Sequence, residues 1–291
     1  MSTQTTVRAD ACSVSSRAAS EPLAGSAPIA RGWIVVEEPG PWGRDALRDS
    51  SIDPQIADAA TELAQQAGVR IIAARHRSRR RLALDAGRNV WLATCSPDSS
   101  EVIHAHVASL TEILQWDLAA IGDGVLPEVG NPVTERLEFI CTHSGRDTCC
   151  AVHGRARADA RSDTWECSHL GGHRFAATSL VLPDGVLFGR LNATEPLTIE
   201  HMRGASRLDS ALQVAEIAVR RYAGWDPFVP LWTDHTDSVE DRDDVVATVR
   251  DGSGRRFQVT CVARSVTRRA SCQQVAQRAI VWEAVHVEEG H

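Results

Sequence analysis

Residues 141–150 read CTHSGRDTCC, residues 168–175 read SHLGGHRF, and residues 180–191 read LVLPDGVLFGRL. Cysteines therefore come first, two histidines follow four positions apart, and a strand–turn–strand pattern comes last. Thiolate and imidazole groups are both good ligands for iron and for zinc. The order of these segments predicts a pair of metal-binding loops that are carried by strands.

The two histidines, His169 and His173, are separated by Leu-Gly-Gly. On a continuous helix, residues four positions apart would place both imidazoles on one face. Two adjacent glycines disfavour a long helix, because each costs about 1 kcal/mol relative to alanine. A tight loop is the better prediction, because glycine allows the backbone to approach a bulky cofactor closely.

Together, these three segments resemble the sucrase/ferredoxin-like family, and the resemblance covers roughly residues 20–225. It implies a thioredoxin-like ferredoxin domain with a [2Fe–2S] cluster held by two cysteines and two histidines. Ordinary thioredoxin-like ferredoxins use four cysteines, and this chain has His-x-x-x-His in place of the last two. The family motif assigns the ligands to Cys141, Cys150, His169 and His173.

The second thiolate ligand is a choice between two adjacent residues, Cys149 and Cys150. The motif places eight residues between its two cysteines, and this spacing from Cys141 favours Cys150. Arg146 and Asp147 also belong to the motif, and we expect them to form an ion pair that fixes the loop rather than to react.

Two alternatives use the same residues. A structural zinc site also accepts two cysteines and two histidines, although its cysteines usually have about two to four residues between them. The gap of eight residues here suits a larger cofactor. A thiol-based redox protein could use Cys149 and Cys150 beside Arg146, but adjacent cysteines rarely form an unstrained disulfide and the chain has no C-x-x-C motif.

The resemblance implies that the protein carries one electron at a time between redox partner proteins, which the sequence does not identify. Neutral imidazole ligands make a cluster less negative than thiolate ligands do, and its reduction becomes easier. Rieske centres, with two histidine ligands, have reduction potentials between about −150 and +300 mV, compared with about −400 mV for plant-type ferredoxins with four cysteines. We expect a reduction potential that falls as the pH rises through the range of imidazole titration.

A glycoside hydrolase needs two carboxylates at a sugar site, and no motif singles out such a pair. The chain therefore resembles an electron carrier, or an oxidoreductase component, more than a stand-alone hydrolase.

The composition is that of an ordinary globular protein, with 291 residues, 43% hydrophobic and 24% charged. The formal net charge of −7 argues against nucleic acid or an anionic membrane as a partner. No apolar run of about 18 residues predicts a membrane span, and the polar N-terminus lacks the apolar core of a signal peptide. A cytoplasmic location is therefore expected, where cysteines stay reduced.

The predicted fold class is α/β (α+β), with two thioredoxin-like units in tandem, because the second half of the chain repeats the element order of the first. Each half has a strand, a helix, three more strands and a final helix, and the second half carries the ligands. The predicted divisions are a disordered tail over 1–20, an N-terminal thioredoxin-like unit over 21–125, a thioredoxin-like ferredoxin domain with the cluster over 132–225, and a linker with a small C-terminal β extension over 226–291.

Overall fold

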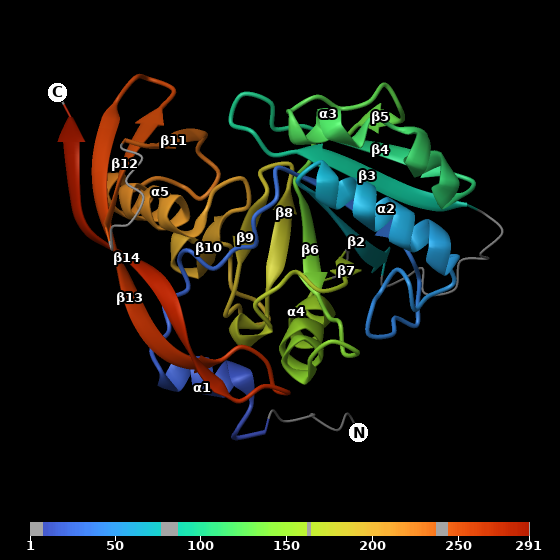
Figure 1. The fold of residues 1–291 in the computed structure, drawn as a ribbon, viewed down its shortest axis with the longest axis horizontal. Helices are drawn as coiled ribbons and strands as arrows, with labels where there is room; N and C mark the ends of the chain where they lie inside the picture. Colours follow the sequence, from blue (N-terminus) through green and yellow to red (C-terminus); the bar gives the residue numbers. More distant parts are fainter. Residues whose placement is uncertain (1–7, 77–86, 162–163, 237–243, 291) are drawn as a thin grey trace.

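The computed structural model describes residues 8–76, 87–161, 164–236 and 244–290, which form one ten-stranded sheet and one four-stranded sheet with helices packed on them (Figure 1). The expected α+β class is confirmed. The large sheet mixes parallel and antiparallel strands in the order β10-β9-β8-β6-β7-β2-β1-β3-β4-β5. Within the described ranges, no helix combines the length and apolar character that a bilayer span requires.

The first half of the chain supplies one side of the large sheet. Its first two strands are parallel, and the third and fourth follow antiparallel, which gives the order β2-β1-β3-β4. The elements are β1 (Gly32–Glu37), α2 (Pro54–Gln66), β2 (Val69–His76), β3 (Arg88–Thr94), β4 (Val102–Val107), a 3-10 helix η3 (Leu110–Gln115), α3 (Leu118–Gly122) and the short β5 (Asn131–Pro132).

The second half of the chain repeats this pairing in the order β7-β6-β8-β9, again with a parallel pair followed by two antiparallel strands. The elements are β6 (Leu137–Cys141), a π-helical turn η4 (Cys150–Gly154), α4 (Arg155–Asp159), β7 (Trp165–Cys167), a 3-10 turn η5 (His173–Phe175), β8 (Ser179–Leu182), β9 (Val186–Phe188), a 3-10 turn η6 (Ile199–His201), β10 (Met202–Ala205) and α5 (Ser210–Ala223). The repeated element order is therefore matched by repeated strand pairing.

The two halves join edge to edge, because β2 pairs antiparallel with β7. An ion pair between Arg75 and Glu166, at 2.7 Å, lies across this junction. The rings of Trp91 and Trp165 also meet there, with centroids 4.5 Å apart. Strands of both halves consequently contribute to one apolar core, which extends from the first half into the strands that carry the cysteine loop.

The boundaries of the two main helices follow their sequence signals. At α2, the side chain of Asp53 accepts a hydrogen bond from the backbone N–H of Gln55, and Pro54 occupies the first helical position. At α5, Asp209 caps the N-terminus and Gly224 ends the helix in the left-handed conformation. The final helix expected in the first half is represented by the 3-10 helix η3, a short element with a capping box between Ser109 and Glu112, and by the short α3.

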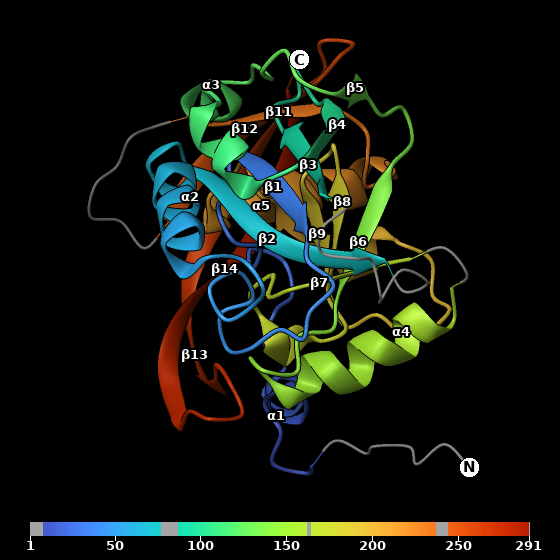
Figure 2. The same cartoon turned by 90° about the vertical axis from the view of Figure 1, so that its right-hand side faces the viewer.

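The C-terminal residues form the four-stranded antiparallel sheet, with strands β11 (Leu231–His235), β12 (Asp244–Asp251), β13 (Arg256–Arg269) and β14 (Ala276–Gly290). One face of this sheet packs against α5 and buries Phe257 and Val249 in a separate apolar cluster. The long β13–β14 hairpin then extends beyond that cluster, and β13 contacts the N-terminal helix α1 (Cys12–Ala18) (Figures 1 and 2). A C-terminal β extension was expected, but not its reach across the molecule.

The N-terminal segment differs from the expected disordered tail over 1–20. Residues 1–7 lie outside the described residues, but residues 12–18 form α1, and Cys12 is completely buried. Ala11 and Cys12 pack with Cys149 and Ala176 in a small apolar cluster. The polar composition of the segment did not predict this contact, because only two small residues, Ala11 and Cys12, provide the apolar surface that packs against the cysteine loop.

Candidate metal centre

The positions of the two ligand loops follow from the parallel pairing of β6 and β7. Cys141 and Cys167 are the last residues of these strands and lie opposite each other in the sheet. Because parallel strands point the same way, the segments that follow them leave from the same edge of the sheet. The cysteine loop after β6 and the histidine loop after β7 therefore lie side by side.

The cysteine loop turns back on itself, so that Cys150 lies against Cys141. Cys150 begins the π-helical turn η4, which continues into α4. A Cβ atom at Gly154, the last residue of η4, would overlap the carbonyl oxygen of Cys141. Only glycine permits this close approach of helix and strand, and both thiols are buried as a result.

The histidine loop is the tight glycine turn that was expected. Gly171 and Gly172 both adopt left-handed backbone conformations, with φ of +77° and +69°. The buried guanidinium of Arg203 donates a hydrogen bond to the carbonyl oxygen of Gly171 at 3.0 Å and supports the turn. The turn stacks the rings of His169 and His173, with centroids 4.9 Å apart and an interplanar angle of 27°.

Three of the four expected ligands share one centre. Ligand atoms of Cys141, Cys150 and His169 all lie within 4.8 Å of one another. His173 is outside this group, but its ring lies against that of His169. The Nδ1 atoms of both imidazoles are buried and have no hydrogen-bond partner in the described part of the chain. Buried polar atoms without partners are costly, and a bound metal group would satisfy these two.

The protonation states of Cys141 and His173 suit metal binding. The hydrogen bond from Cys150 holds the pKa of Cys141 well below its usual value, and the pKa of Cys150 is raised in turn. Burial lowers the pKa of His173 to about 4, so its imidazole is neutral at pH 7. Thiolates and neutral imidazoles are the forms that bind metal ions.

Cys149 and Cys150 point into different groups. Cys150 lies with Cys141 and His169, whereas Cys149 lies with Cys12 and Cys272. No local sequence pattern predicts this second group, because its members come from α1, from the cysteine loop and from the turn between β13 and β14. Only a three-dimensional structure brings together residues that are more than a hundred positions apart.

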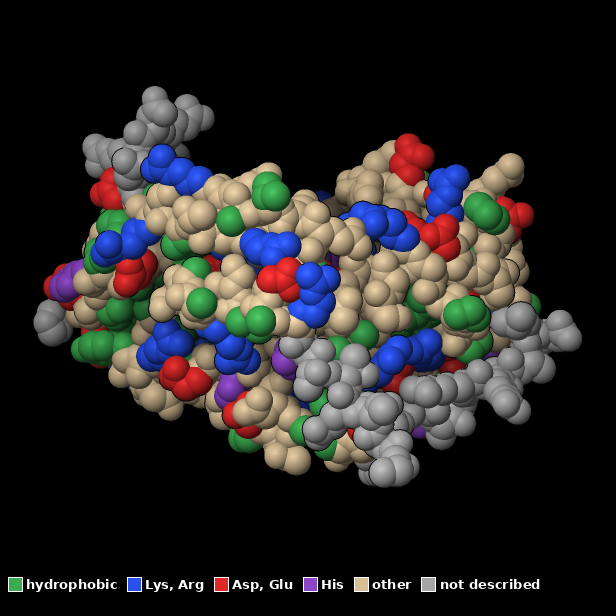
Figure 3. All heavy atoms as spheres, turned by 90° about the horizontal axis from the view of Figure 1, so that it is seen from below, with side chains coloured by type: hydrophobic (Ala, Val, Ile, Leu, Met, Phe, Trp, Pro, Cys, Tyr) green, Lys and Arg blue, Asp and Glu red, His purple; other side chains and the backbone are tan. Residues whose placement is uncertain are grey.

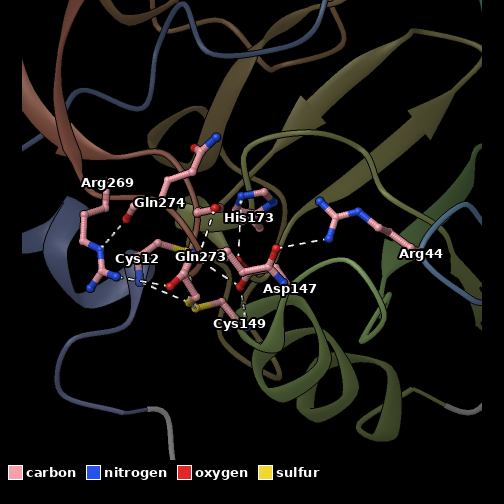
Figure 4. A network of polar contacts seen from close by, with 10 residues as sticks. Cys12, Arg44, Asp147, Cys149, His173, Arg269, Gln273 and Gln274 are labelled. Atoms are coloured by element: carbon pink, nitrogen blue, oxygen red, sulfur yellow. Dashed lines mark hydrogen bonds and ion pairs between the residues drawn. The ribbon is translucent and has the colours of Figure 1, made fainter.

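The expected ion pair between Arg146 and Asp147 is not formed. Arg146 is exposed, whereas the carboxylate of Asp147 is buried and faces the thiols of the second group (Figure 4). Asp147 accepts hydrogen bonds from the backbone N–H groups of Cys149 and Cys272, at 2.9 and 3.0 Å. Burial alone would raise the pKa of Asp147, but these N–H donors and His173 lower it.

A pocket of about 150 Å³ connects the first group to the surface. His169 lines this pocket together with His143, Arg44 and Arg146. The underside of the molecule, seen in Figure 3, carries Arg side chains mixed with Asp and Glu, so the described residues show no continuous basic patch on that face.

Comparison with known proteins identifies the family of this chain. The family model described as sucrase/ferredoxin-like matches residues 23–202, well over half of the chain, and includes all four expected ligands. A search of curated proteins and a search of solved structures each return no match.

Proposed function

We propose, on the premise that this chain belongs to the sucrase/ferredoxin-like family, that it is an electron-transfer protein with a [2Fe–2S] cluster. Cys141, Cys150, His169 and His173 would hold the cluster. The proposal depends chiefly on one observation: the two thiols converge on His169, the ring of His173 stacks on that of His169, and the buried Nδ1 atoms of both imidazoles have no partner among the described residues. Paired thiolate and imidazole ligands are those of the Cys2His2 class of [2Fe–2S] sites.

When bound, the cluster supplies one-electron transfer at a potential raised by its two neutral ligands. The chain's own residues bind and orient it. The buried Cys141 and Cys150 exclude water from the sulfur side, and the neutral His173 adds no charge. The guanidinium of Arg203 supports the histidine turn and brings a buried positive charge near the thiolates, which would offset part of the cluster's negative charge.

We assign the cluster to a thioredoxin-like unit over roughly 132–225, preceded by a second such unit over roughly 21–125. The strand pairing supports this assignment, because both halves have a parallel pair followed by two antiparallel strands. The first unit contributes no ligand. Its edge strand β2 instead pairs with β7 beside the cysteine loop and closes one side of the site.

Redox partner proteins would exchange electrons through His169, the ligand that lines the surface pocket. Arg44 and Arg146 line the same pocket, so an acidic surface on a partner would be attracted to it. All eight cysteines are free. This agrees with a cytoplasmic location, where thiols remain reduced.

Anaerobic purification, an absorption spectrum and assays of iron, sulfide and zinc test the proposal. We expect about two irons and two sulfides per chain. The variants Cys141→Ser and His169→Ala should lose most of this iron. Cys167→Ser is the matched control, because Cys167 is equally buried and ends the neighbouring strand.

Two results would contradict the cluster. Zinc at the four residues, without sulfide, would assign a structural zinc site instead. A metal-free protein with a reactive Cys149 would assign thiol chemistry, an alternative that gains some support from geometry. The hydrogen bond from Cys12 lowers the pKa of Cys149 to about 6, which favours a thiolate at neutral pH.

A further inference from the structure

A second group of side chains that could hold a metal ion gathers around Cys149 of the cysteine loop (Figure 4). The Sγ atoms of Cys12, Cys149 and Cys272 form a nearly equilateral triangle, with edges of 3.6, 3.5 and 3.6 Å. Both carboxylate oxygens of Asp147 lie 3.8 Å from the Sγ atom of Cys12. Three sulfur atoms and a carboxylate therefore surround one point.

We propose that Cys12, Cys149, Cys272 and Asp147 bind one zinc ion, separately from the cluster site. In a tetrahedral shell with Zn–S distances of about 2.3 Å, neighbouring sulfurs are about 3.8 Å apart. The observed edges of 3.5 to 3.6 Å are close to this value. Three thiolates with one carboxylate oxygen form a donor set that suits zinc.

The surrounding backbone orients these donors. The N–H group of Cys12 donates to the Sγ atom of Cys272 at 3.4 Å. Asp147 receives N–H groups on both oxygens, from Cys149 on one and from Cys272 on the other. Such donors to the ligand atoms hold them in place and are typical of the outer shell of a metal site.

The second group is mostly buried, but a metal ion can reach it from the protein surface. Cys12, Cys149 and Asp147 are buried, and Cys272 is only partly exposed. A pocket of about 80 Å³ leads to Cys149 and Cys272 from the surface. An ion could enter through this pocket, and the thiols would release their protons to solvent as it binds.

Other uses of the three thiols fit the geometry less well. A disulfide requires an S–S distance of about 2.05 Å and would leave the third thiol and the carboxylate of Asp147 buried beside it. A four-iron cluster would bind each thiolate to a different iron, which needs wider spacing than a common centre. The equal distances instead favour a single ion.

The site would fasten three distant segments of the chain together. Cys12 belongs to α1, Cys149 to the cysteine loop, and Cys272 to the turn between β13 and β14. The guanidinium of Arg269 also links the two segments, because it donates to the backbone oxygens of Asp10, just before α1, and of Cys272 in the turn. The zinc site would therefore hold α1 and the turn between β13 and β14 against the loop that carries Cys150.

Zinc content of the full-length chain tests the proposal, after expression with added zinc and removal of loosely bound metal. We expect about one zinc ion per chain in the wild type and loss of most of it in Cys12→Ser and Cys272→Ser. Cys261→Ser is the matched control, since Cys261 is buried in the same C-terminal sheet but packs against α5. Cys141→Ser should keep the zinc while losing iron and sulfide, so the two sites fail independently.

Four results would overturn the proposal. The first is a wild-type protein without zinc, and the second is zinc retained in both Cys12→Ser and Cys272→Ser. The third is zinc lost in Cys141→Ser but retained in Cys12→Ser. The fourth is a disulfide among the three cysteines in protein purified under reducing conditions. If the serine variants do not fold, X-ray absorption at the zinc edge of the Cys141→Ser protein decides the question. Three sulfur ligands and one oxygen support the site, whereas a shell with two nitrogens places the zinc among the histidines.

Discussion

The carboxylate of Asp147 lies 3.8 Å from the Nε2 atom of His173, so one buried anion separates the two sulfur-containing groups. Asp147 faces the thiols of Cys12 and Cys272 on one side and a proposed cluster ligand on the other. Because Cys149 and Cys150 are adjacent but point into different groups, two successive residues also connect the two sites. A change of charge at one site should therefore shift the reduction potential or the affinity of the other, although each site can be occupied without the other.

Replacing Asp147 by asparagine should raise the reduction potential of the cluster. The substitution removes a negative charge beside His173, and a nearby negative charge disfavours the reduced, more negative cluster. The expected rise is on the order of tens of millivolts. Redox titration followed by electron paramagnetic resonance measures it, with the exposed Asp123→Asn as control. The same variant should also bind zinc more weakly, and an unchanged potential would argue against a cluster beside His173.

Replacing Gly154 by alanine should disrupt the turn that places Cys150 beside Cys141. The backbone of Gly154 has φ of −66°, which alanine adopts readily, so the only conflict is the overlap of Cβ with the carbonyl oxygen of Cys141. We expect the free energy of unfolding to fall by about 1–3 kcal/mol, with lower iron content. Gly252→Ala is the control, because a Cβ there meets only ordinary contacts. Equal stability of both variants would contradict the predicted strain.

Sequence patterns predicted those parts of the fold that depend on local chemistry. The helix over 54–66 follows from its Asp53 cap and Pro54, and the histidine turn follows from two adjacent glycines. The repeated element order of the two halves likewise reflects hydrophobic runs that can be read along the chain. These features could be predicted because the residues that cause them are neighbours in sequence.

Contacts between distant segments could not be predicted in this way. Cys12 lies in a stretch of Ser, Thr and Ala that has the composition of a tail, yet it is buried against Cys149. Nothing in the sequence around Cys272 indicates that a long hairpin carries it to the same place. Asp147 was expected to pair with its neighbour Arg146, but burial beside two N–H donors and His173 determines its contacts instead.

Replacing His173 by cysteine should preserve a cluster and lower its potential. A thiolate adds a negative charge that neutral imidazole lacks. The reverse replacement, of two cysteine ligands by histidines, raises the reduction potential of a cluster by hundreds of millivolts. We expect a fall on the order of 100 mV, measured by redox titration of the anaerobic protein. His201→Cys is the control, because this residue lies in η6, away from both sulfur groups. Loss of all iron in His173→Cys with retention in His173→Ala would contradict a ligand role for His173.

Replacing Glu216 by glutamine should destabilise the attachment of the C-terminal sheet and change its response to acid. The buried carboxylate on α5 pairs with Arg207 at 2.6 Å and Arg220 at 2.9 Å, and accepts a hydrogen bond from Thr233 on β11. Burial would raise the pKa of Glu216, but the two guanidinium groups outweigh it and lower the pKa below the ordinary value. Removing one partner of a buried ion pair costs about 3–5 kcal/mol.

The pH dependence of this effect follows from the lowered pKa of Glu216. A carboxyl group with a lower pKa in the folded state stabilises the fold above its unfolded pKa of about 4.3, and this stabilisation is lost as the pH falls through the folded pKa. The variant should therefore be less stable than the wild type at pH 7, and the difference should shrink below about pH 4. Urea unfolding at several pH values measures this, with the exposed Glu128→Gln as control. A constant difference across the acid range would show that the ion pairs do not account for the loss.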